Sequence, residues 1–163
     1  MIFLAIGTQF PFDRLVRAVD DIFGQGLIDE EIFAQTGESS YKPRNFEAVS
    51  SLEYSVFAKY MREASSVISA AGIGTITMAL DNKKPLLIMP RLKKYREVVN
   101  DHQLAIARKF EELGHVLVAY STQEMPNKIK LLKTFKPRRR DNQAQMVAQR
   151  IDKFLKELNR ASE

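Results

Sequence analysis

Two glycines at the end of an apolar run form a pattern that could hold a phosphate. Gly72-Ile-Gly-Thr75 follows the apolar segment Ser66–Ser69 and precedes residues with helical spacing that continue to Leu80. Glycines at such a junction let backbone N–H groups approach a phosphate at the positive end of a helix, and Thr75 adds a hydroxyl donor. The dinucleotide fingerprint is incomplete, because Thr77 stands in place of its third glycine and the phosphate-loop lysine is absent. A tight turn with no ligand is the alternative.

Polar residues follow a second apolar run, at the N-terminus. Gly7, Thr8 and Gln9 come directly after Ile2–Ile6, which we predict to be a buried strand. Open parallel sheets bind ligands at the carboxyl edge of their strands. A glycine allows close approach there, and threonine and glutamine side chains supply hydrogen bonds. An ordinary loop is equally compatible with this triplet.

A third polar group includes Asp101, His102 and Gln103, which we place in the first turn of a helix capped by Asn100-x-x-Gln103. The loop before it is basic and contains Arg91, Lys93, Lys94 and Arg96. A phosphate, a uronate or sugar hydroxyls could bind to these groups. The alternatives are a capping histidine and a solvated basic loop. With two histidines, no cysteine and no clustered carboxylates, we predict no metal site built from side chains.

Composition narrows the class of protein. The chain has 163 residues, of which 45% are hydrophobic and 28% charged, so we predict a single globular domain over 1–163. The absence of cysteine excludes disulfides and thiol catalysis, and we expect neither a signal peptide nor a transmembrane helix. The net charge of +5 is concentrated in Lys83–Arg96 and Lys128–Arg140, which favours an anionic neighbour such as a nucleotide, nucleic acid or lipid headgroup.

Strands that alternate with helices must position these residues. Segments with helical periodicity alternate with short apolar runs. This alternation is typical of a parallel sheet flanked by helices, an α/β Rossmann-like fold. The predicted strands are Ile2–Ile6, Ile32–Ala34, Phe46–Val49, Ser66–Ser69, Leu86–Met89 and Val116–Ala119. We expect capping boxes at Ser50-x-x-Glu53 and Ser121-x-x-Glu124 as well. A long C-terminal helix is predicted over 139–160, and Lys136–Arg140 is the expected exposed joint before it.

The motifs together resemble the glycosyltransferase family 28 C-terminal domain. The resemblance rests on the segments Ile2–Gln9, Pro11–Leu15, Ser69–Thr75, Pro90–Tyr95 and Asp101–Gln103, and it covers Met1 to about Leu158. The chain is most similar to the separate donor-binding subunits of two-chain glycosyltransferases. These include bacterial exopolysaccharide subunits of the PssE type and the soluble subunit of the eukaryotic enzyme that adds the second N-acetylglucosamine to dolichol-linked sugar. The Pro-Arg-Leu-Lys-Lys-Tyr95 pattern favours the bacterial branch.

This resemblance implies half of an enzyme with the GT-B architecture, equivalent to its C-terminal, donor-binding half. The implied activity is that of a hexosyltransferase subunit in exopolysaccharide or capsule synthesis, inactive without a membrane-anchored partner that binds a lipid-linked sugar acceptor. The implied substrate is a UDP-sugar, with no other cofactor and no nucleic acid. The implied location is cytoplasmic, at the inner face of the membrane through the partner.

The resemblance assigns the UDP-sugar site residue by residue. The two glycine turns contribute Gly7, Thr8, Gln9, Gly72, Gly74 and Thr75, and the polar set near the sugar is Arg91, Asp101, His102 and Gln103. We expect the catalytic base to lie outside this chain, with His102 as the alternative. Two positions depart from the family: Ala70 replaces a histidine found in many relatives, and Met78 replaces the glutamate that holds the ribose hydroxyls in single-chain members.

Other classes of function stay open at this point. The run Lys128–Arg140 and the pI near 9.5 are compatible with a basic nucleic-acid-binding domain, although Phe135 is its only aromatic residue. A free-standing nucleotide-binding or dinucleotide oxidoreductase domain is a further alternative. The missing third glycine and the absence of a catalytic half count against it.

Overall fold

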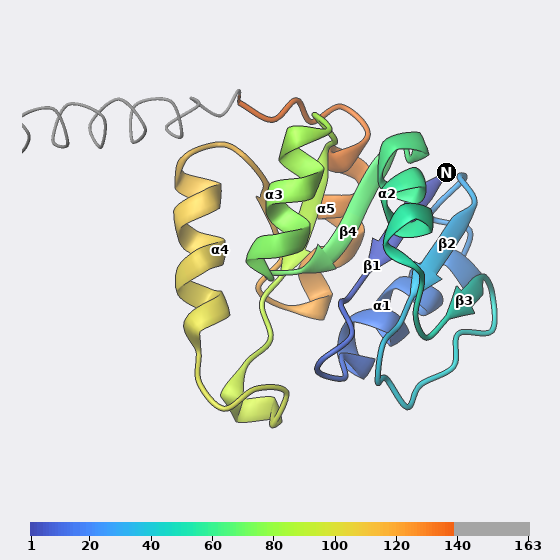
Figure 1. The fold of residues 1–163 in the computed structure, drawn as a ribbon, viewed down its shortest axis with the longest axis horizontal. Helices are drawn as coiled ribbons and strands as arrows, with labels where there is room; N and C mark the ends of the chain where they lie inside the picture. The colour runs from blue at the N-terminus through green and yellow to red at the C-terminus, as the bar shows by residue number, and fades with distance from the viewer. Residues whose placement is uncertain (139–163) are drawn as a thin grey trace, which may run out of the picture.

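One parallel sheet forms the centre of the computed structural model, which describes residues 1–138 (Figure 1). Within those residues the sheet has six strands in the order β3-β2-β1-β4-β5-β6, and every neighbouring pair is parallel. The strands are β1 Ile2–Ala5, β2 Ile32–Gln35, β3 Glu47–Val49, β4 Ser66–Ala70, β5 Leu86–Met89 and β6 Leu117–Val118. β1 starts the chain yet lies inside the sheet, between β2 and β4.

Helices cover both faces of this sheet (Figure 1). They are α1 Asp13–Gly24, α2 Tyr54–Glu63, α3 Ile73–Asp81, α4 His102–Glu112 and α5 Met125–Leu132. Helices α1 and α5 pack on the face that receives Ile2 and Leu4, whereas α2, α3 and α4 pack on the face that receives Phe3. Because both faces are covered, β1 and β5 are buried along their whole length and read in the sequence as unbroken apolar runs.

The predicted fold class is confirmed, and each of the six predicted strands is present: Leu86–Met89 has the predicted bounds, and no end of the other five is shifted by more than one residue. The predicted C-terminal helix over 139–160 and part of the expected joint Lys136–Arg140 lie outside the described residues. Within 1–138, no helix is both long and apolar enough to cross a membrane.

Two of the predicted capping boxes are wrong. α2 begins at Tyr54 with Glu53 at the N-cap, so Ser50 lies outside the helix, and its backbone carbonyl accepts the N–H of Gly37. At α4 the Asn100 side chain does accept the N–H of His102 at 3.1 Å, but the Gln103 side chain is engaged elsewhere. At α4 the pattern fails because the Gln103 side chain has a partner outside the helix, and at α2 it fails because the helix begins later than the pattern places it.

The third box is present in altered form. The Ser121 hydroxyl donates to Glu124 at 3.0 Å, and Glu124 also accepts the N–H of Tyr120 at 3.1 Å. These bonds close a short 3₁₀ turn, Thr122–Glu124, which leads directly into α5.

Asp20 is buried, although an acidic pair such as Asp20-Asp21 is typical of a solvated helix face. Asp20 is 1% exposed and accepts four hydrogen bonds from the loop before β3: from the Tyr41 hydroxyl at 2.6 Å, from the backbone N–H groups of Arg44 and Asn45 and from the Asn45 amide. Burial by itself would raise the pKa of Asp20, but these hydrogen bonds outweigh it and hold the pKa below its ordinary value.

Candidate functional site

A pocket of about 340 Å³ opens at the carboxyl ends of β1, β4 and β5. β1 and β4 are neighbours in the sheet, but the chain connects them to strands on opposite sides: β1 leads to β2 on one side, and β4 leads to β5 on the other. In open α/β sheets ligands bind at this reversal, because the loops after the two strands separate there. The pocket is lined by Ile6, Gly7, Thr8, Gln9, Phe10, Ala70, Gly72, Gly74, Thr75, Arg91, Val98 and Gln103.

The sequence-predicted residues mostly meet in this pocket. Eight of the ten line it, from three separate segments of the chain: Gly7, Thr8 and Gln9; Gly72, Gly74 and Thr75; Arg91 and Gln103. The other two, Asp101 and His102, lie at the start of α4 outside the lining. Asp101 accepts the backbone N–H of Lys93 at 2.8 Å, which ties the start of α4 to the preceding loop.

The backbone conformation of the loop after β1 favours a glycine at position 7. Gly7 has a φ of +78°, a left-handed conformation that favours glycine. A second glycine, which the sequence analysis missed, lies against it: a Cβ at Gly37 would lie 2.2 Å from the Gly7 carbonyl oxygen. Any side chain at position 37 would therefore displace the loop after β1, which lines the pocket.

The glycines of α3 have a different explanation. Gly72 is the N-cap of α3 with φ −87°, and Gly74 lies in its first turn, so neither has a conformation that requires glycine. A Cβ at either position would meet nothing within 4 Å. Folding therefore does not require these glycines, and what they provide is bare backbone facing the pocket.

The amino end of α3 is also without a side-chain cap. The first N–H groups of a helix have no partner inside the helix, and they carry the positive end of its dipole. Here Ile73, Gly74 and Thr75 contribute those N–H groups, beside a pocket that Gly74 and Thr75 line. Such an arrangement binds anions, above all phosphate oxygens.

Arg91 adds a buried cation, and the structure shows how it is held. Its side chain reaches from the end of β5 to the loop after β1, where the guanidinium donates to the carbonyls of Ile6 and Phe10, both at 2.7 Å, and to that of Pro11 at 3.2 Å. Burial lowers the pKa of Arg91 to about 10, partly opposed by the nearby charge of Glu97, so the group stays charged at neutral pH. Arg91 thus shapes the β1 loop and supplies positive charge at the pocket wall.

Arg14 and Glu97 brace the same wall, and sequence reasoning missed both. The Arg14 guanidinium donates to Glu97 at 2.8 and 2.9 Å and to the Pro90 carbonyl at 2.9 Å. Glu97 in turn accepts the N–H of Leu92 at 2.9 Å. No local signal could reveal this pair, because 83 residues separate its members.

Gln103 is the residue of the polar set that faces the pocket. Its side-chain carbonyl accepts the Arg91 N–H at 3.1 Å, which fixes the orientation of the amide. The amide NH₂ group is then available to a ligand in the pocket that Gln103 lines. His102 is exposed, and its backbone N–H is taken by Asn100.

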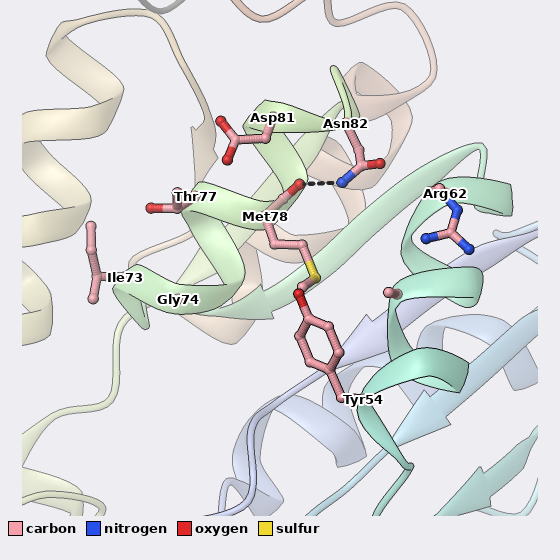
Figure 2. Close-up of a pocket in the computed structure, with 9 residues that line it drawn as sticks. Tyr54, Arg62, Ile73, Gly74, Thr77, Met78, Asp81 and Asn82 are labelled. Atoms are coloured by element: carbon pink, nitrogen blue, oxygen red, sulfur yellow. Dashed lines mark hydrogen bonds between the residues drawn. The ribbon is translucent and has the colours of Figure 1, made fainter. Parts of the chain in front are cut away.

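A second hollow, a groove of about 510 Å³, runs between α2 and α3 and meets the pocket at Gly74, which lines both. Figure 2 shows Met78 and Tyr54 pointing toward one another across the groove, with Arg62 and Asn82 farther along it. Asn82 is fixed by a hydrogen bond from its amide to the Met78 carbonyl at 2.8 Å. The groove is therefore apolar near Gly74 and polar at its far end.

The basic run near the C-terminus is partly neutralised where the structure describes it. Lys128 lies 3.5 Å from Glu111, and Lys133 pairs with Asp29. Among residues 1–138, no group of three or more metal-binding side chains comes together.

Comparison with known proteins places this geometry in context. Residues 1–159 match the model of the glycosyltransferase family 28 C-terminal domain. No curated protein matches the chain.

Three solved structures have similar folds. The NMR solution structure of ALG13 aligns with a TM-score of 0.60 and 22% identity, covering 83% of this chain and 87% of ALG13. The glycotransferase of kitacinnamycin aligns with a TM-score of 0.59 and 16% identity, covering 82% of this chain and 34% of that one. The glycosyltransferase VinC in complex with DTDP aligns with a TM-score of 0.52 and 20% identity, covering 81% and 33%. The chain thus spans about a third of two of these proteins and most of ALG13.

Proposed function

The chain belongs to the glycosyltransferase family 28 C-terminal domain family, and on that premise we propose that its pocket binds the diphosphate of a nucleotide-sugar donor. The observation that carries the proposal is the uncapped amino end of α3, where two glycines that the fold does not require leave backbone N–H groups open to the pocket. The positive charge of Arg91, which lines the same pocket, suits the same anion. In agreement with this assignment, VinC, which has a similar fold, was solved with the nucleoside diphosphate DTDP.

The groove between α2 and α3 would take the nucleoside. It begins at Gly74, so a diphosphate at the end of α3 directs the attached ribose and base into it. Tyr54 is 73% exposed at its edge and offers an aromatic face to a base. Because Met78 supplies no carboxylate, the ribose hydroxyls would depend on other polar side chains of the groove, which are Thr77, Asp81 and Asn82 on and after α3 and Arg62 on α2. We propose UDP as the nucleotide of the donor.

The sugar would lie toward Gln103, on the other side of the diphosphate. In the proposed reaction the acceptor hydroxyl oxygen forms a bond to the anomeric carbon, and the bond from that carbon to the diphosphate oxygen breaks. The negative charge that develops on the leaving diphosphate is stabilised by the N–H groups of α3 and by Arg91. The acceptor proton passes to a base outside this chain, since His102 is not among the residues that line the pocket.

We further propose that the acceptor half is a separate, membrane-anchored chain that presents a lipid-linked sugar for exopolysaccharide synthesis at the inner face of the membrane. The proposal follows from the resemblance of the sequence motifs to donor-binding subunits of two-chain glycosyltransferases, and the fold is similar to that of ALG13. A GT-B active site lies between two Rossmann-like halves, and the described residues form one such sheet.

The test is sugar transfer from radiolabelled UDP-sugars to a lipid-linked acceptor in membranes. The purified chain alone should give no transfer, and membranes that contain the partner should give transfer only when the chain is added. Turnover by the purified chain without a membrane fraction would overturn the two-component proposal. A Gly74→Val variant that supports full transfer would overturn the donor site.

A further inference from the structure

The loop between β5 and α4 carries a charge pattern that donor binding does not use. Lys93, Lys94 and Arg96 are all exposed, and within residues 1–138 none of them forms a salt bridge. The acid inside the loop, Glu97, is already paired with Arg14. The three cations are therefore exposed and form no salt bridge within residues 1–138, although the Asp101 carboxylate lies near them, where it accepts the backbone N–H of Lys93 at 2.8 Å.

Apolar side chains are exposed between and beside these cations. Tyr95 is 51% exposed and Val99 is 77% exposed, the highest value among the exposed large hydrophobic residues of the described chain. The Lys94 ammonium lies 4.8 Å from the centre of the Tyr95 ring and the Arg14 guanidinium lies 4.6 Å from it, so two cations contact the ring. An aromatic ring and a valine among basic residues match the layered chemistry of a membrane surface, with anionic headgroups outside and acyl chains below.

The position of this segment suits such a contact. Figure 1 shows the turn at 93–95, in yellow-green, extending away from the sheet and its helices beyond the start of α4. The loop is also part of the pocket wall, because Arg91 at its base and Val98 near its end line the pocket. It is braced by the hydrogen bonds of Arg14 and Asp101, so its exposed side chains project from a fixed support.

We propose that the basic loop, residues 93–99, docks directly on an anionic lipid bilayer and holds the mouth of the pocket at the membrane surface. The three cations contact lipid phosphates, while Tyr95 and Val99 enter the headgroup layer. The chain then has a membrane contact of its own, in addition to any made through a partner. The lipid surface is favoured because one short loop exposes three cations together with a tyrosine and a valine, which match the anionic headgroups and the interfacial layer of a bilayer.

The experiment measures binding of the purified chain to vesicles of phosphatidylcholine with and without phosphatidylglycerol. Each basic residue near an anionic membrane strengthens binding about fivefold, so replacing Lys93, Lys94 and Arg96 with glutamine should weaken it on the order of a hundredfold. The matched control replaces three exposed lysines elsewhere, Lys42, Lys59 and Lys130, with glutamine and removes the same charge. The control should lose no more than a fewfold.

A second measurement locates the contact. The chain has no tryptophan, so Val99→Trp introduces a single fluorophore at the loop, and Leu131→Trp introduces one on α5 as a control. Anionic vesicles should shift the emission of the first to the blue and leave the second unchanged. Equal losses of vesicle binding in the two triple glutamine variants, or an unshifted emission of Val99→Trp, would overturn the proposal. If the triple variant of the loop keeps its vesicle binding and loses binding to a protein partner, the loop is a contact for that partner and not for lipid.

The proposed lipid contact does not depend on donor binding. Titration of the same variants with UDP reports on the pocket alone, so failure of lipid docking and failure of the proposed donor site give different results.

Discussion

Replacement of Gly74 by alanine separates stability from donor binding. Gly74 has a helical conformation in the first turn of α3, and an added Cβ would meet no atom of the chain within 4 Å. Alanine has the higher helix propensity and restricts the unfolded chain, so Gly74→Ala should stabilise the protein by roughly 0.5–1 kcal/mol. For a chain of this size that corresponds to a rise of roughly 1–4 °C in Tm.

The same methyl group should weaken nucleotide binding. It would stand between the diphosphate and the N–H groups of α3, and each hydrogen bond to a charged group that is lost costs about 1.5–3 kcal/mol. The Kd for UDP should therefore rise roughly 10- to 100-fold in calorimetry, while thermal unfolding shows the more stable fold. Ser55→Ala is the matched control, because Ser55 is exposed at the corresponding position of α2 and lines neither the pocket nor the groove.

The outcome decides between two explanations of the glycine. A variant that is more stable and binds UDP as before would refute the argument that Gly74 is present for the ligand. A variant that is less stable would refute the argument that its Cβ has free space.

Three further substitutions test the wall of the pocket and its support. Arg91→Lys should lower the free energy of unfolding by about 2 kcal/mol, because one ammonium nitrogen cannot occupy both the Nε and Nη2 positions from which the guanidinium donates to three carbonyls. UDP affinity should fall with it, and Arg44→Lys at an exposed site should change neither. Asp20→Asn should destabilise by about 2 kcal/mol in urea unfolding at neutral pH, with exposed Asp21→Asn as its control. The pKa of Asp20 is lower in the folded protein, so its contribution is present above the unfolded pKa and is lost as the pH falls through the folded one; the difference between the wild type and Asp20→Asn should therefore shrink in acid. Gln103→Ala should weaken binding of a UDP-sugar by about 1 kcal/mol more than binding of UDP, whereas His102→Ala should weaken neither; equal losses for both ligands would remove Gln103 from sugar recognition.

The sheet was predictable from sequence because both of its faces are covered. Strands such as Leu86–Met89 are buried at every position, and an unbroken apolar run between turn residues is enough to find them. The order of parallel strands then brings the residues after β1 and β4 to one edge, which is why glycine patterns more than sixty residues apart could be assigned to one site.

The hydrogen bonds that hold the loops around the site in place were not predictable in the same way. Arg91 looks like a solvated residue of a basic loop, yet its guanidinium is buried among carbonyls that lie eighty or more residues earlier. Asp20 looks like half of a solvated pair, yet it organises a loop twenty residues later. Both roles depend on which segments pack together, and helical or strand periodicity carries no such information. The groove between α2 and α3 depends on the spacing of two helices and leaves no sequence pattern either.

Amide NMR of the ¹⁵N-labelled chain during titration with UDP tests the central claim most directly. If the diphosphate binds at the carboxyl ends of β1 and β4, the largest shifts should fall on Gly7, Thr8 and Gln9 and on the first turn of α3, Ile73–Thr75, with saturation at one UDP per chain. Amides of α5, on the opposite side of the sheet from α3, should not move. Shifts confined to other segments, or no saturable shift at Gly74 and Thr75, would contradict the claim that this pocket holds the donor.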